Sequence, residues 1–124
     1  MYKFFLYISF LIVPCSIYAQ GTTDTFRLFF DLDVPTLNDK MQKKIDLLIY
    51  NDKILSGSSV TIIGYADYLG TNTYNQDLSM KRAQNVKDYL VTYGINPEDI
   101  TLCVGRGKVD RTNVTGKDGS PRDR

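Results

Sequence analysis

Three polar residues near the middle of the chain combine types and spacing that are suited to charge recognition. Asp67 stands in an expected loop, and Asn75 and Arg82 follow in a segment of helical periodicity. Asn75 and Arg82 are two helical turns apart with Ser79 between them, so a helix places all three on roughly one face. Taken alone, Asp67 and Arg82 most often indicate an internal salt bridge of structural value. The alternative is that they offer one anion and one cation to a charged ligand.

The segment that carries Asn75 and Arg82 is predicted to be a helix. From about Asn72 onward, apolar residues recur at helical spacing at Leu78, Ala83, Val86 and Leu90. Gly94 and the pair Asn96-Pro97 then provide the residue types that end helices.

Three short apolar runs rich in β-branched or aromatic residues predict strands. They cover Phe26 to Phe30, Val60 to Ile63 and Ile100 to Val104. An amphipathic helix is expected between the first two runs, where apolar residues share one helical face at Leu37, Met41, Ile45 and Leu48. The order βαβαβ indicates an α/β fold, an α+β sandwich with two helices packed on one face of a small mixed sheet.

The composition limits the classes of function. With 124 residues, 43% hydrophobic and 23% charged, the chain has the balance of one globular domain. A formal net charge of +1 argues against a protein that depends on a strong field to hold nucleic acid or anionic lipid, so no nucleic acid is expected as a partner. The sequence has no histidine and only two cysteines, so it lacks the residues that metal catalysis and histidine acid-base chemistry require. We therefore expect a binding domain without a cofactor and not an enzyme.

Residues 1–19 have the pattern of a secretory signal peptide. Lys3 supplies the positive end, the apolar run Phe4 to Val13 follows, and Ile17-Tyr18-Ala19 offers a cleavage site before Gln20. The apolar run is shorter than the roughly 20 residues that cross a bilayer. We therefore expect a mature domain over residues 20–124.

The two cysteines are expected to have different fates. Cys15 closes the signal segment and raises lipid attachment as a rival to cleavage, but Val13 and Pro14 are not the small residues that such a site requires. Once Cys15 is removed, Cys103 stays alone in an apolar run, which favours a packed small hydrophobe over a reactive thiol.

A series of short motifs runs from the second expected strand to the end of the second helix. They are Ile63-Gly64-Tyr65-Ala66-Asp67, Gly70, Tyr74-Asn75, Leu78-Ser79-Met80-Lys81-Arg82-Ala83, Tyr89-Leu90 and Gly94-Ile95. Their order and spacing resemble, without a gap, the OmpA-like peptidoglycan-binding domain that also occurs in peptidoglycan-associated lipoproteins and flagellar stator proteins. Phe29-Phe30-Asp31-Leu32-Asp33 and Val104-Gly105-Arg106-Gly107 extend the resemblance over essentially the whole mature chain.

The resemblance implies noncovalent binding of peptidoglycan, which would anchor the cell envelope to the cell wall. It also implies a periplasmic location at the outer membrane, with outer-membrane proteins as further partners. In that family an aspartate and an arginine hold the diaminopimelate of the stem peptide, and they correspond to Asp67 and Arg82. The family's ligand-contacting asparagine falls on Asn75, and Arg124 matches the first arginine of a later pair. Diaminopimelate carries a carboxylate and an ammonium on one carbon, which suits an arginine and an aspartate.

The sequence departs from the family pattern in two places. Tyr65 and Ala66 stand where histidine and threonine are commonest, so contacts from those side chains are lost or replaced. The family's chain continues past the arginine pair into a final hydrophobic strand, whereas this sequence ends at Arg124. We therefore expect a C-terminally truncated domain whose neighbouring strand has unpaired backbone groups. The alternative function is a truncated, non-binding remnant or an assembly fragment.

Overall fold

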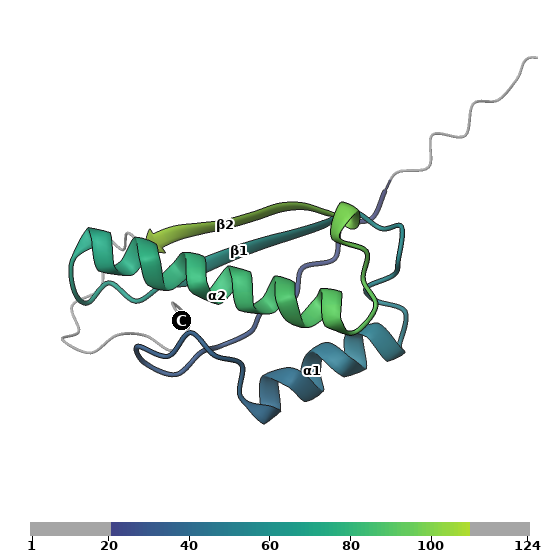
Figure 1. Cartoon of the computed structure of the whole chain (residues 1–124), viewed down its shortest axis with the longest axis horizontal. Helices are drawn as coiled ribbons and strands as arrows, with labels where there is room; N and C mark the ends of the chain where they lie inside the picture. The colour runs from purple at the N-terminus through teal and green to yellow at the C-terminus, as the bar shows by residue number, and fades with distance from the viewer. Residues whose placement is uncertain (1–20, 110–124) are drawn as a thin grey trace, which may run out of the picture.

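The structure is a computed structural model, and it describes residues 21–109. Its elements in chain order are α1 (Asp39–Tyr50), β1 (Val60–Ala66), α2 (Asn72–Thr92), the short 3-10 helix Pro97–Asp99 and β2 (Ile100–Lys108) (Figure 1). The expectations for the signal peptide, Cys15 and Arg124 lie outside the described residues. Both predicted helices and the second and third predicted strands are confirmed.

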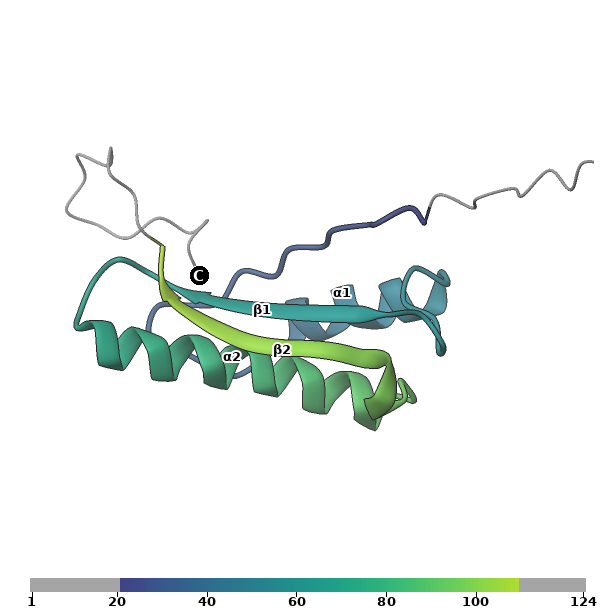
Figure 2. The same cartoon turned by 90° about the horizontal axis from the view of Figure 1, so that it is seen from above.

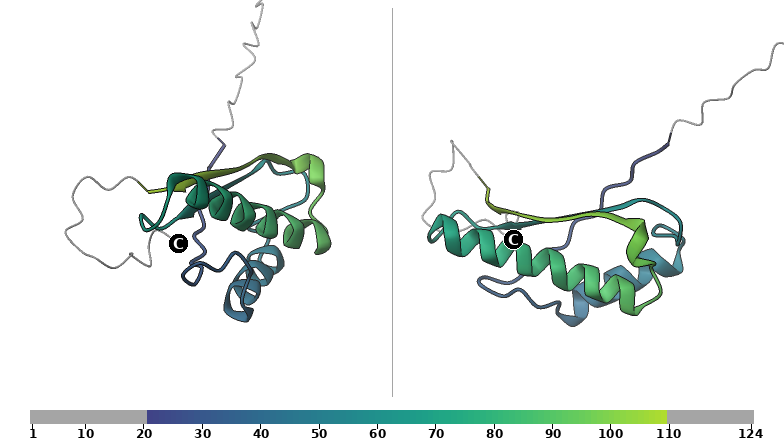
Figure 3. Two further views of the ribbon diagram at one scale, coloured as in Figure 1. Left: turned by 60° about the vertical axis from the view of Figure 1, so that its left-hand side comes forward. Right: turned by 45° about the horizontal axis from the view of Figure 1, so that its top comes forward.

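The two strands are parallel neighbours, with Ile62 opposite Cys103 and Ile63 opposite Val104. Both helices lie beneath the same face of this sheet, and α2 runs along the strands (Figures 1 and 3). The expected α/β arrangement with two helices on one face is therefore confirmed. No helix within residues 21–109 is long and apolar enough to cross a membrane.

The segment from Phe26 to Phe30 is not a strand, so this expectation was wrong. Its side chains do alternate, because Leu28 packs against the core and Phe30 is buried, whereas Phe29 is half-exposed. Among the described residues, however, β1 pairs with β2 only, and the segment lies on the side of β1 away from β2 (Figure 2). A strand needs a ladder partner as well as the right side-chain pattern.

The sheet of the described residues is therefore two-stranded and parallel, not the expected mixed sheet of three strands. Two strands agree with the expectation that a strand of the family pattern is missing. The extended segment is held instead by side chains, since Lys44 Nζ donates to the Arg27 carbonyl oxygen at 2.6 Å.

The core joins both helices to the sheet. Its buried members are Ile45, Ile62, Ala83, Leu90 and Ile95. Cys103 packs against this cluster, and burial raises the pKa of its thiol. Both observations support the prediction that Cys103 is a packed small side chain, because a reactive cysteine needs a lowered pKa.

Local sequence explains where the helices begin and end. The Asn38 side chain accepts from the Met41 backbone N–H at the start of α1, and the Thr71 hydroxyl accepts from the Tyr74 N–H at the start of α2. After α2, Gly94 adopts a φ of +101°, and the Ile95 N–H bonds back to the Leu90 carbonyl oxygen. The predicted glycine stop is therefore confirmed.

Glycines in both strands let α2 approach the sheet closely. A Cβ atom on Gly64 would overlap the Ser79 carbonyl oxygen, and one on Gly105 would overlap the Met80 backbone nitrogen. The Ser79 hydroxyl uses this proximity, because it donates to the Gln76 carbonyl oxygen at 2.9 Å and accepts from the Gly107 N–H at 2.8 Å. This contact brings the polar face of α2 against the carboxyl ends of the strands.

Candidate ligand-binding site

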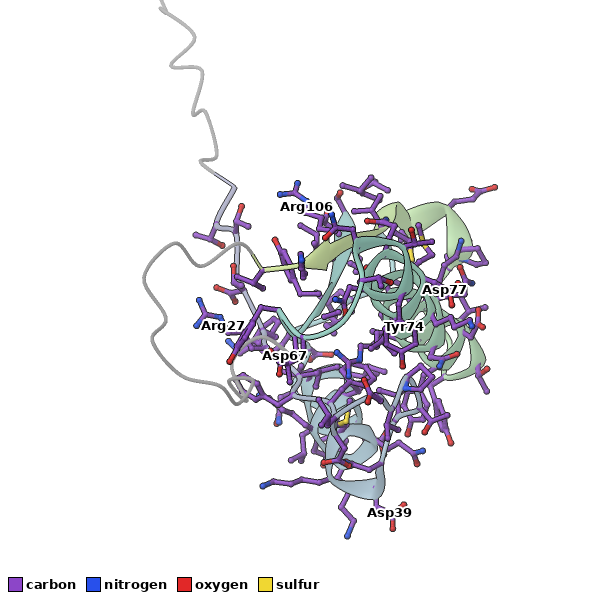
Figure 4. All side chains as sticks on the ribbon, turned by 90° about the vertical axis from the view of Figure 1, so that its left-hand side faces the viewer. Arg27, Asp39, Asp67, Tyr74, Asp77 and Arg106 are labelled. Atoms are coloured by element: carbon purple, nitrogen blue, oxygen red, sulfur yellow. The ribbon has the colours of Figure 1, made fainter. Side chains whose placement is uncertain are left out.

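The predicted site residues gather where β1 ends and α2 begins. Asp67 directly follows β1 and is 4% exposed, while Asn75 and Arg82 are each 1% exposed. Ser79, between them on α2, is fully buried. The prediction that Asn75, Ser79 and Arg82 share one face of a helix is therefore confirmed. Figure 4 views this end of the molecule and shows Asp67 between the strand ends above and α1 below.

Arg82 donates to backbone carbonyl oxygens from two other segments of the chain. Its Nη2 donates to Asp31 at 2.8 Å and its Nε to Val34 at 3.1 Å, both in the loop before α1. Its Nη1 donates to Tyr65 at 3.0 Å, near the end of β1. The guanidinium carbon also lies 5.0 Å from the centre of the Phe30 ring, within the range of a cation-π contact.

Through these bonds Arg82 ties α2 to the loop before α1 and to β1, so it has a structural role as well as a candidate role in ligand contact. Its acceptors at Asp31 and Val34 are 51 and 48 residues away in sequence. A buried cation is stable only when its donors are satisfied, and carbonyl oxygens provide that here. The positive charge of Arg82 is therefore held at a fixed place beside the end of β1.

Asn75 holds the loop between β1 and α2, residues 67–71, which we call the Asp67 loop. Its Nδ2 donates to the Leu69 carbonyl oxygen at 2.6 Å, and its backbone N–H donates to the Thr71 carbonyl oxygen at 3.1 Å. Gly70, with a φ of +87°, turns the chain between those two acceptors. Such a backbone conformation favours glycine.

The Asp67 carboxylate sits between these two anchors. Arg82 holds the Tyr65 carbonyl two residues before it, and Asn75 holds the Leu69 carbonyl two residues after it. Asp67 Oδ1 also accepts from the Tyr68 N–H at 2.7 Å. The arrangement thus presents a buried carboxylate in the loop before α2 and a buried cation from the middle of α2, the two opposite charges that a small zwitterionic group requires.

Sequence reasoning missed the partners of Arg82. The carbonyl oxygens of Asp31, Val34 and Tyr65 have no residue-type pattern, because any residue supplies one. The run Asp31-Leu32-Asp33 was interpreted only as part of a motif of the family resemblance, yet Asp33 has a φ of +55°, which marks a tight turn in that loop. The fourth predicted site residue, Arg124, lies outside the described residues.

Comparison with known proteins gives consistent matches. The model of the OmpA family matches residues 29–124. Outer membrane protein A of Klebsiella aerogenes is 40% identical over 104 residues, which cover 78% of this chain and 29% of that protein. Outer membrane protein A of Bordetella avium is 35% identical over 82 residues, covering 66% of this chain and 42% of that protein. The chain therefore matches less than half the length of these two relatives.

Two solved structures share the fold. The OmpA-like domain of FopA1 from Francisella tularensis subsp. tularensis SCHU S4 has a TM-score of 0.58 and 35% identity, covering 77% of this chain and 63% of that one. The peptidoglycan-associated lipoprotein from Burkholderia pseudomallei has a TM-score of 0.56 and 25% identity, covering 77% and 79%.

Proposed function

This chain belongs to the OmpA family, and we propose that it is a periplasmic module that binds peptidoglycan noncovalently and holds the cell envelope to the wall. Two comparisons support the proposal, the match to the family model and the structural likeness to a peptidoglycan-associated lipoprotein. The single observation that carries it is the Asp67 loop, held on one flank by Arg82 and on the other by Asn75.

The proposed ligand is the diaminopimelate of the stem peptide. Its free end carries an ammonium and a carboxylate on one carbon, so the two charges are separated by only one atom. Asp67 accepts hydrogen bonds from the ammonium, and the Arg82 charge attracts the carboxylate. Asn75 supports both by holding the loop. Each charge-assisted hydrogen bond contributes about 1.5 to 3 kcal/mol net, so a single site binds modestly.

Modest affinity for one stem peptide suits a polymeric ligand. Peptidoglycan repeats the same group along its length, so a released module rebinds at a neighbouring site, and several modules on one envelope add avidity. The proposed role is therefore binding without bond cleavage, with retention that depends on the density of the ligand.

The experiment that tests the ligand compares two wall types. Purified chain is mixed with peptidoglycan containing diaminopimelate and, separately, with peptidoglycan containing lysine, and each mixture is centrifuged. Lysine presents a terminal ammonium without the adjacent carboxylate, so it is a matched control for the proposed recognition. We expect pelleting with the diaminopimelate wall only. Equal pelleting with both walls would show that the zwitterionic end is not what the site recognises.

A second candidate function is a non-binding remnant, favoured by one observation. The described residues form only two strands, and Phe26 to Phe30 has no ladder partner among them. An incompletely packed fold would bind the dye ANS strongly and lose near-ultraviolet circular dichroism. A native near-ultraviolet spectrum with weak dye binding would exclude this candidate and leave the binding module.

A further inference from the structure

One edge of β1 has no neighbouring strand in the described part of the chain. Within residues 21–109 the ladder partner of β1 is β2 alone, so the backbone groups on the other edge are available for pairing. Charged side chains on an edge strand normally discourage pairing with other chains. The seven residues of β1 include no charged side chain, so its free edge lacks this protection.

The outer edge of β2 is protected in ways that the free edge of β1 is not. Arg106 and Lys108 stand among the last three residues of β2. Side chains of α2 also use its backbone, because one donates to the Gly105 carbonyl oxygen at 2.7 Å and another accepts from the Gly107 N–H at 2.8 Å. The two edges of the sheet are therefore not equivalent, and β1 offers the better template for a further strand.

Residues 26–30 form a second extended backbone on the free side of β1. They run in the same direction as β1 and lie on its side away from β2 (Figure 2). Within the described part of the chain none of their N–H groups donates a hydrogen bond, and of their carbonyl oxygens only that of Arg27 accepts one. Leu28 and Phe30 nevertheless turn toward the core. The segment therefore has the alternation of a strand without a ladder.

Arg82 limits how far apart these two backbones lie at one end. Its guanidinium donates at 2.8 Å to Asp31, directly after the extended segment, and at 3.0 Å to Tyr65 in β1. One planar group with two such bonds keeps the two carbonyl oxygens within about 8 Å of each other. An α-helix, about 10 to 12 Å across with its side chains, does not fit between them. A single extended strand does, because neighbouring strands lie only about 4.8 Å apart.

Exposed apolar side chains flank the same place. On the face of the sheet away from the helices, Ile63 is 37% and Tyr65 is 38% exposed, and Phe29 of the extended segment is 46% exposed. A strand between them would cover part of each as a cross-strand neighbour. Its opposite face would lie over the core, where Leu28 and Ile62 pack. Such surroundings favour β-branched and aromatic residues in the added strand.

We propose that the space between residues 26–30 and residues 60–66, the β1 slot, binds an extended segment of another protein by strand addition. The segment runs antiparallel to both walls, because antiparallel pairing is the more stable kind. Its backbone groups point alternately to the two walls, so both of its edges must be free. A strand that already belongs to a sheet has at most one free edge. The partner therefore supplies an exposed segment rich in β-branched residues and not the edge of a folded sheet.

The β1 slot is distinct from the candidate ligand-binding site. The slot follows residues 60–66, whereas Asp67 lies beyond the end of β1 in the loop before α2. Peptide binding is therefore measured in the absence of peptidoglycan, and its failure would leave the proposed binding of the wall untouched.

Fluorescence polarisation with three synthetic peptides tests the β1 slot. The chain from Gln20 onward, which keeps every described residue, is titrated into a labelled peptide of seven alternating valines and threonines between a glutamate and a lysine. Seven residues match the length of β1. Two further peptides carry N-methyl groups on the odd or on the even backbone amides, which removes the N–H donors of one edge only. The parent is expected to bind, and each methylated peptide to bind at least about 10-fold more weakly.

A single free edge would give a different result from a slot with two walls. A peptide that pairs with β1 alone can turn its unmethylated edge toward the strand, so methylation of the other edge would not matter. Undiminished binding of either methylated peptide, or no binding of the parent, would overturn the proposal. So would a stable dimer of the chain alone that the peptide does not dissociate in analytical ultracentrifugation, because a second copy would then fill the slot.

Hydrogen exchange locates the bound peptide. Amides of residues 26–30 should exchange rapidly in the free chain, because they donate to no other described residue. The peptide is expected to slow their exchange together with that of residues 60–66. Residues 56–59, in the loop before β1, are the internal control and should not change. Protection confined to β2 would place the peptide on the other edge of the sheet and would overturn the proposal.

Two lysine substitutions provide a matched pair of variants. Ile63→Lys changes the outer face of β1 beside the slot, whereas Leu102→Lys changes the same face of β2, beyond it. The two side chains are similarly exposed, at 37% and 41%, so neither change disturbs the core. Loss of a cross-strand apolar contact should weaken peptide binding about fivefold in Ile63→Lys and leave Leu102→Lys like the wild type. Equal weakening in both would mean that the peptide lies across the outer face of the sheet and not in the slot.

Discussion

Arg82 Nη1 donates a 3.0 Å hydrogen bond to the carbonyl oxygen of Tyr65, two residues before Asp67. Arg82, which is expected to attract the ligand carboxylate, therefore also holds the end of the strand that leads to Asp67, the expected partner of the ligand ammonium. Binding and folding are coupled through this one guanidinium. Substitution of Arg82 removes both at once, whereas substitution of Asp67 changes a side chain that takes no part in the bonds from Arg82 to the Asp31, Val34 and Tyr65 carbonyl oxygens.

Arg82→Lys should destabilise the fold strongly although it keeps the charge. A lysine ammonium is a point donor and cannot span carbonyl oxygens of Asp31, Val34 and Tyr65 as the guanidinium does. Two buried acceptors lose a charged donor, which we expect to cost about 3 kcal/mol of unfolding free energy. Urea denaturation measures it. The neighbouring Lys81→Ala, on the exposed side of α2, is the control and should leave the midpoint unchanged. A similarly small effect for Arg82→Lys would refute the structural role.

Gly64→Ala should force α2 away from the sheet. The added methyl group meets the backbone of Ser79, which cannot rotate aside as a side chain can. Overpacking of this kind typically costs about 1 to 3 kcal/mol, and we expect the upper end of that range. Thermal unfolding followed by circular dichroism gives the comparison. Gly21→Ala, where no atom lies within 4 Å of the added carbon, is the matched control. Equal melting temperatures for the two variants would contradict the close packing.

Asn75→Asp should loosen the loop that carries Asp67. The substitution replaces the amide that donates to the Leu69 carbonyl oxygen with a carboxylate that repels it. We expect a loss of about 2 kcal/mol in unfolding free energy together with weaker peptidoglycan binding. Asn72→Asp makes the same chemical change at an exposed position in the first turn of α2, where a negative charge is favourable. If both variants have the same unfolding free energy, the hydrogen bond from Asn75 to the Leu69 carbonyl oxygen does not stabilise the fold.

Tyr89 should make the stability sensitive to alkaline pH. Burial and the hydrogen bond to Asp46 raise the pKa of its phenol above the ordinary value of 10.0. A raised pKa means that the folded state favours the protonated, neutral phenol. The stabilisation is therefore fully present below pH 10.0 and is lost as the pH rises through the higher value of the folded state.

Urea denaturation at several pH values above neutrality measures this loss. Tyr89→Phe removes the ionising group and should flatten the alkaline decline. Tyr50→Phe changes a tyrosine that is 84% exposed and should leave the decline as in the wild type. An identical decline in all three proteins would show that Tyr89 does not contribute to it.

The spacing of apolar residues predicted most helices and strands, because each element must turn apolar side chains toward the core. The run Leu37, Met41, Ile45 and Leu48 indicated the first helix, and Met41 and Ile45 are its buried residues. Val60 to Ile63 and Ile100 to Val104 indicated strands, which extend further than expected to Ala66 and Lys108. Both extensions pass through glycines, which have no side chain to contribute to an apolar pattern.

The wrong strand prediction and the missed acceptors of Arg82 have one physical cause, because both depend on contacts between residues that are far apart in the sequence. Phe26 to Phe30 has strand-like alternation, but pairing depends on a neighbour that the segment itself cannot specify. Similarly, Arg82 was interpreted from its charge, whereas its hydrogen bonds reach carbonyl oxygens in a loop about 50 residues earlier. The shared helical face of Asn75 and Arg82 was predictable because it depends only on spacing.

Co-sedimentation of the chain from Gln20 to Arg124 with diaminopimelate-type peptidoglycan, beside Asp67→Asn, tests the central claim most directly. The substitution keeps the shape of the side chain and removes the negative charge proposed to accept the ligand ammonium. Circular dichroism and urea denaturation establish that the variant is folded. We predict that the wild type pellets with the wall and that Asp67→Asn, equally folded, stays in the supernatant. Equal pelleting of both proteins would contradict the assignment of the site.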